Sequence, residues 1–161
     1  MRPLIIDALI ALQGFVVAFI ALHDWVPLGA LNDVSAVQAA DPRSKLITVT
    51  ALSTAPFAVG LGGTIAYAGA RFPEWLTWYL WISYGAVVFG VWRAWWGPYL
   101  LGGAGARATR YKAMFARTHA FMPERNGIRP NTLHVTLHVV VIAILVLLGF
   151  LSFSIPQAPP A

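Results

Sequence analysis

Residues 132–153 read TLHVTLHVVVIAILVLLGFLSF, a run that contains no Asp, Glu, Lys or Arg. A helix rises about 1.5 Å per residue, so a run of this length can cross the roughly 30 Å of hydrocarbon in a bilayer. A soluble core helix does not need so long an apolar stretch. Residues 132–153 are therefore predicted to span a membrane.

Three further apolar runs precede this one, and the composition of the whole chain agrees with them. Of the 161 residues, 58% are hydrophobic and 11% are charged, with a mean hydropathy of +0.69, unlike an ordinary soluble domain. Unpaired backbone groups are costly in lipid, and these runs lack the alternation of barrel strands. We expect an all-α fold, a transmembrane four-helix bundle, with residues 1–161 forming a single membrane domain. The predicted spans are 3–22, 46–70, 75–100 and 132–153.

The basic residues are distributed unevenly between the two sides of such a bundle. Arg2 and Arg71 lie on the side that holds both termini, and all the other Lys and Arg residues lie on or border the opposite side. Lys and Arg close to membrane spans are retained in the cytoplasm. We therefore expect a bacterial inner (plasma) membrane protein with both termini outside and the basic loops cytoplasmic. The net charge of +5 then reflects topology and contacts with anionic lipid headgroups, and no nucleic-acid partner is expected.

The two loops on the basic side carry helical signals of their own. In the first loop, Asn32 or Asp33 is placed to cap a short helix that runs to about Ala40. In the third loop, residues 106–118 (ARATRYKAMFART) interleave basic and apolar side chains, which is typical of an amphipathic surface helix. We expect one short amphipathic helix in each of these loops.

Aromatic residues gather at the two ends of the third run. Trp75, Trp78 and Trp81 lie at one end, and Trp92, Trp95, Trp96 and Tyr99 lie at the other. Indole and phenol rings favour the boundary between lipid and water. We interpret these aromatic residues as interfacial belts.

Polar and titratable residues recur at one membrane depth, at the cytoplasmic ends of three spans. Asn131, His134 and His138 lie within about 60° of one another on a helix that turns about 100° per residue, so they share one face. Ionisable groups in or beside a membrane usually face the bundle interior and pair with each other or with a ligand. The candidate pocket residues are His23, Asp24, Arg93, Asn131, His134 and His138.

The third loop ends in HAFMPERNGIRPN, residues 119–131, where prolines and Gly127 predict a rigid turn. This turn presents Arg125 and Arg129, and arginines beside backbone amides suit an anion such as a lipid phosphate or carboxylate. Arg125 and Arg129 are therefore candidate ligand-binding residues together with Arg93. The alternative is that the segment only caps the entry into the last helix.

These residues do not decide which cofactor or ligand the pocket binds. Imidazoles at positions i and i+4, with a third His or a carboxylate, allow zinc or non-haem iron. The chain has no cysteine, which excludes thiolate ligands and disulfides. Haem is less favoured, because bis-histidine ligation needs rings on opposite sides of the macrocycle and no binding motif accompanies them. A lipid or a non-haem metal remains as the candidate occupant.

These observations favour an integral membrane protein with a polar pocket at the cytoplasmic leaflet that binds a small anionic or amphipathic ligand. A membrane-embedded enzyme that uses His and Asp for acid–base chemistry is an alternative. An oligomeric channel or transporter is another, since Gln13 and Asp24 share a face of the first span. An accessory subunit of a larger membrane complex is the third. Membrane lipids are the expected partners, with a homo-oligomer or a larger complex as further options.

Four segments spread along the chain read HDWVPLG (23–29), LNDV (31–34), RAWWGPYL (93–100) and THAFMPERNGIRPNTLH (118–134). With these segments the sequence resembles small uncharacterised four-span bacterial integral membrane proteins. The resemblance implies the four-span architecture. It implies no activity and assigns no role to a residue.

Overall fold

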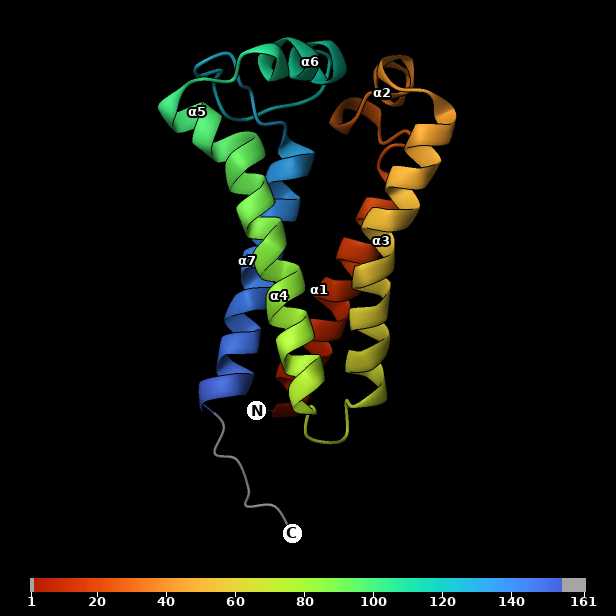
Figure 1. Cartoon of the computed structure of the whole chain (residues 1–161), viewed down its shortest axis with the longest axis vertical. Helices are drawn as coiled ribbons and strands as arrows, with labels where there is room; N and C mark the ends of the chain where they lie inside the picture. Colours follow the sequence, from red (N-terminus) through yellow and green to blue (C-terminus); the bar gives the residue numbers. More distant parts are fainter. Residues whose placement is uncertain (1, 155–161) are drawn as a thin grey trace.

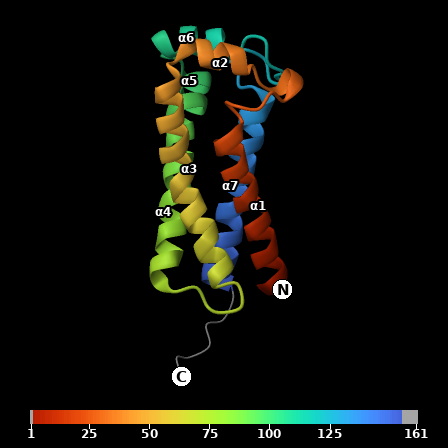
Figure 2. The same cartoon turned by 90° about the vertical axis from the view of Figure 1, so that its right-hand side faces the viewer.

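The computed structural model describes residues 2–154, and helices account for most of them. Four long helices lie side by side along the long axis of the molecule (Figures 1 and 2). These are α1 (Arg2–Leu22), α3 (Arg43–Ala66), α4 (Glu74–Val91) and α7 (Thr132–Gly149). Around the bundle, α1 packs against α3 and α7, and α4 packs against the same two helices.

Two of the long helices continue through a widened, π-helical turn. After α4 the chain passes through η2 (Trp92–Trp96) into α5 (Gly97–Leu101), and after α7 it passes into η3 (Phe150–Ser154). The connections on one side contain η1 (Gly29–Leu31), α2 (Val34–Ala40) and α6 (Ala106–Phe115). Short helices therefore occupy the first and third loops, as predicted. Figures 1 and 2 show α2 and α6 lying across the end of the bundle opposite the N-terminus.

Three helical stretches among the described residues are long and apolar enough to cross a membrane, namely α1, α3 and Thr132–Phe153. The third predicted span is not one of them. Its helix α4 begins at Glu74 and contains repeated Trp and Tyr residues, whose polar atoms lower its hydropathy. The composition therefore supports three spans, and the crossing by α4 remains a prediction.

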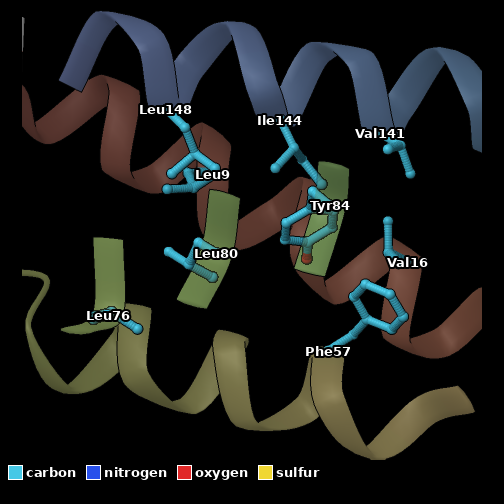
Figure 3. Packing of buried hydrophobic residues seen from close by; sticks show 9 residues of the cluster. All are labelled: Leu9, Val16, Phe57, Leu76, Leu80, Tyr84, Val141, Ile144 and Leu148. Carbon is cyan, nitrogen blue, oxygen red and sulfur yellow. The ribbon is translucent and has the colours of Figure 1, made fainter. Parts of the chain in front are cut away.

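The centre of the bundle is a cluster of buried apolar side chains contributed by all four long helices (Figure 3). On α4 these side chains are Leu76, Leu80 and Tyr84, spaced four residues apart along one face. In lipid, close packing holds helices together, because lipid tails are as apolar as the side chains themselves. The cluster consists of Leu9, Val16, Phe57, Leu76, Leu80, Tyr84, Val141, Ile144 and Leu148.

Ion pairs join the two loops into one end layer, by which we mean α2, α6 and their flanking residues 33–41 and 106–117. Asp33 caps α2 by accepting the Ala36 N–H at 3.0 Å, and its other oxygen lies 2.6 Å from Nε of Arg117. Asp41 pairs with Arg110 of α6 and with Lys45. The end layer therefore ties the first loop to the third above the ends of α1 and α7.

Candidate functional site

Three histidines come together beneath the end layer, one directly after α1 and two on α7, and we call His23, His134 and His138 the imidazole cluster. The ring of His134 lies 5.8 Å from that of His23 and 6.5 Å from that of His138, measured between centroids. Trp95 of η2 packs against His134 at 4.9 Å. The structure thus brings together three of the predicted pocket residues, from the ends of helices far apart in the sequence.

Asn131 fixes both the start of α7 and the orientation of His134. Its side-chain oxygen accepts the backbone N–H of His134 at 3.0 Å and lies 2.7 Å from Nδ1 of the same residue. Asparagine is a favoured N-cap because it satisfies such an otherwise unpaired N–H group. An amide oxygen can only accept, so Nδ1 of His134 carries the proton. In the neutral ring, Nε2 of His134 then presents a free lone pair.

His23 and Asp24 lie in contact just after the end of α1. Nδ1 of His23 donates to the Phe19 carbonyl at 2.9 Å, and Nε2 lies 3.2 Å from Oδ1 of Asp24. Burial raises the pKa of Asp24, the nearby His23 opposes this rise, and Asp41 adds to it. The pair therefore places a carboxyl group of raised pKa next to the imidazole cluster.

His138 is the most buried member of the imidazole cluster, with 4% of its surface exposed, and its Nδ1 has no hydrogen-bond partner among residues 2–154. The indoles of Trp95 and Trp96 surround it at 6.3 and 5.9 Å. The side-chain nitrogen of Asn131, a residue only 1% exposed, is also unpartnered within the described chain. A buried polar group without a partner costs roughly 1–3 kcal/mol. The site therefore has hydrogen-bonding capacity that residues 2–154 leave unused.

His138 also borders a groove of about 280 Å³ between α7 and the helices α4, η2 and α5. The other lining side chains are apolar or aromatic, and several of them face outward: Trp92 is 47% exposed and Ile142 is 54% exposed. In a membrane such a groove opens toward the acyl chains. The full lining is Val88, Val91, Trp92, Trp96, Leu100, His138, Val141 and Ile142.

The widened turn η2 forms for a reason that the sequence explains. Pro98 has no N–H to donate to the Ala94 carbonyl, and its ring would clash with that carbonyl in a regular helix. The turn instead closes with the Gly97 N–H bonded to the Trp92 carbonyl. A Cβ atom on Gly97 would lie 2.9 Å from that carbonyl oxygen, so glycine is the residue that fits. Such turns frequently occur at functional sites.

The three arginines predicted as anion ligands lie on the surface. Arg93 is exposed, and its backbone carbonyl accepts a hydrogen bond from Nη1 of Arg107 at 2.6 Å. Arg125 pairs with Ile128 through the backbone in a tight turn, and Arg129 donates to the Ala120 carbonyl at 3.4 Å. Within residues 2–154, none of the three has a hydrogen bond or ion pair with the imidazole cluster or with Asp24. No ion pair between Arg93 and Asp24 is present among the described residues.

Sequence reasoning missed the aromatic wall of the site. The belt interpretation is wrong for Trp95 and Tyr99, which are 5% and 6% exposed. Trp95 stacks on Tyr111 at 4.4 Å. Phe115 of α6 completes this wall, 5.1 Å from His134. The available signal was the spacing of Trp95 and Tyr99, which are four residues apart, so they share a helix face and are both buried.

Metal ligation receives no geometric support from the part of the chain that the structure describes. Residues 2–154 contain no group of three or more His, Cys, Asp or Glu side chains placed to hold a metal ion. The unpartnered atoms at His138 and Asn131 instead match a ligand that forms hydrogen bonds.

Comparison with family models, curated proteins and solved structures gives no match to this chain. The resemblance to small four-span bacterial membrane proteins therefore stays a prediction.

Proposed function

We propose that this protein is an integral membrane protein that binds an amphipathic ligand at the imidazole cluster. The apolar part of the ligand lies in the groove between α7 and α4–α5, and its polar group hydrogen-bonds to His138. The observation that carries the proposal is that His138 lines an otherwise apolar groove and that its buried Nδ1 has no hydrogen-bond partner among residues 2–154. Buried polar groups are normally paired, so an unpaired one bordering a groove marks a binding position.

The position of His138 along α7 sets the depth of the proposed contact. His138 lies six residues after Thr132, where α7 begins, which is about 9 Å at about 1.5 Å per residue. The polar group of the ligand would therefore lie below the end layer, and its chain would extend along the groove into the bilayer. The partner of the protein in this proposal is a membrane lipid.

The membrane arrangement forms part of the same proposal. We infer four spans in a bacterial inner membrane, with the end layer and the imidazole cluster on the cytoplasmic side. The concentration of Lys and Arg in the loops around the end layer supports this orientation. The N-terminus and the loop between α3 and α4 lie together at the opposite end of the molecule (Figure 1).

Native mass spectrometry of the detergent-purified protein, incubated with a bacterial polar lipid extract, tests this proposal. Wild type is expected to retain a lipid adduct that His138→Leu loses, because the substitution removes the hydrogen bond and keeps an apolar side chain of similar reach. His119→Leu is the matched control, since His119 is exposed and bonds Thr132 outside the cluster. Equal retention by both variants would show that the proposed site is wrong.

A further inference from the structure

The charge of the ligand can be inferred from the groove, and this inference rests on the proposed function. Among the residues that line the groove, His138 is the one with a titratable side chain, and neither Lys nor Arg contributes to the lining. A buried anion is stable only when a cation or several hydrogen-bond donors compensate for its lost hydration. The groove described by residues 2–154 provides no such cation.

The basic residues at this end of the bundle form ion pairs or hydrogen bonds outside the groove, or are exposed. Arg110 and Arg117 are held in ion pairs with Asp41 and Asp33. Arg107 donates to the backbone carbonyl of Arg93, whose own side chain is exposed. Most of the basic residues therefore lie in and around the end layer, where they can meet lipid headgroups at the surface, and Arg2 and Arg71 lie at the opposite end. No basic residue of the described chain lines the groove.

A charged His138 is also disfavoured by its surroundings. Its imidazole lies between the indoles of Trp95 and Trp96, and another imidazole, that of His134, has its ring centroid 6.5 Å away. No carboxylate of the described chain forms an ion pair with His138. A neutral imidazole, which offers one donor and one acceptor, best fits this environment.

We propose that the groove binds a neutral acylglycerol, a lipid whose polar end is an uncharged hydroxyl or ester group that hydrogen-bonds to His138. A hydroxyl both donates and accepts, so it can use whichever nitrogen of the neutral ring is free. The groove volume of about 280 Å³ lies at the lower end of the range for small-molecule pockets. It holds one segment of a single chain, and the rest of the chain stays in the bilayer.

The test compares two lipids that have the same acyl chain, one with a neutral and one with an anionic headgroup. Dibromostearoyl glycerol is neutral, whereas the lyso-phosphatidylglycerol with the same dibromostearoyl chain carries a phosphate. Both quench tryptophan on contact, and Trp92 and Trp96 line the groove. In detergent at neutral pH, the neutral lipid is expected to bind wild type about tenfold more tightly than the anionic one. His138→Leu should weaken binding of the neutral lipid about tenfold, and His119→Leu should leave it unchanged.

A second variant tests the inference even if His138→Leu folds poorly. His138→Gln keeps a hydrogen-bonding side chain that cannot become charged, so binding of the neutral lipid should stay within about threefold of wild type. If wild type binds the anionic lipid more tightly than the neutral one, and His138→Gln loses this binding, the inference that the ligand is neutral is wrong. The proposed function would then still stand. Binding of both lipids that is unaffected by either His138 substitution would overturn the inference and the proposed function together.

Discussion

Asn131 shows how much a single side chain contributes to the site. One oxygen atom caps α7 and also holds the His134 ring through Nδ1. The cap stabilises the helix, and the ring contact determines which nitrogen of His134 is available to a ligand. Helix stability and the tautomer of His134 thus depend on the same residue. Substitutions with side chains of different length can separate the two effects.

We predict that Asn131→Ala destabilises the protein more than Asn131→Ser does. Both substitutions should release the His134 ring from its hydrogen bond at Nδ1. Serine still caps the helix but is too short to hold the ring as well, so Asn131→Ser should unfold close to wild type. Alanine loses the cap and should cost about 1 kcal/mol. Thermal unfolding in detergent measures the first effect, and nitrogen NMR of the imidazoles measures the tautomer of His134. A preserved Nδ1–H tautomer in both variants would contradict the assigned role of Asn131.

The long helices are predictable from the sequence because length and hydropathy suffice to find them. The predicted runs 3–22 and 132–153 match α1 and the stretch Thr132–Phe153 almost residue for residue, and 46–70 overlaps α3 with an offset of a few residues. The inward faces could not be predicted in the same way. A membrane helix is apolar on all sides, so hydropathy does not distinguish the face that contacts lipid from the face that packs in the bundle core. For this reason the burial of Trp95 and the outward position of Arg93 emerge only in the structure.

Close contact between α3 and α4 depends on two glycines. A Cβ atom on Gly63 would lie 2.7 Å from Cδ1 of Leu76, and one on Gly60 would lie 3.0 Å from Cδ2 of Leu80. Both leucines are fully buried in the central cluster, so they have little room to move. Small residues at such crossings let membrane helices approach one another closely.

We predict that Gly63→Ala destabilises the bundle whereas Gly62→Ala does not. Alanine favours a helix over glycine by up to about 1 kcal/mol, and a Cβ on Gly62 meets nothing within 4 Å. At Gly63 the same gain is opposed by overpacking against Leu76, which typically costs about 1–3 kcal/mol. Unfolding of both variants in the same detergent measures the difference. If Gly63→Ala is as stable as Gly62→Ala, the α3–α4 contact is looser than described.

At the scale of the whole molecule, the end layer and the groove give the imidazole cluster two different boundaries. Toward the loops, α6 covers the cluster through Phe115, which packs against His134 and Trp95. Toward the side of the bundle, the groove beside His138 is open. An apolar ligand would therefore enter from the bilayer, and the end layer would separate the site from water. The ion pairs of Asp33 with Arg117 and of Asp41 with Arg110 join α2 to α6 in this layer.

We predict that the end layer loosens in acid. Hydrogen bonds from Ser35 and from the Ala36 N–H, together with Arg117, lower the pKa of Asp33, and Lys45 and Arg110 lower the pKa of Asp41. A carboxyl group whose pKa is lowered by folding stabilises the folded state above its ordinary pKa of 3.8. This stabilisation is lost as the pH falls through the lowered value. Because both ion pairs are exposed to solvent, high salt should weaken them as well.

Spin labels at Ala39→Cys of α2 and Ala113→Cys of α6 measure this loosening directly, because the chain has no cysteine of its own. The distribution of distances between the two spin labels should be narrow at neutral pH and should broaden below pH 3.8. Asp33→Asn should broaden it already at neutral pH, since the pair with Arg117 and the charged cap of α2 are lost. Glu124→Gln, a change at an exposed carboxylate outside these pairs, is the control. A distribution that stays narrow in Asp33→Asn would show that apolar contacts, and not the ion pairs, hold α2 against α6.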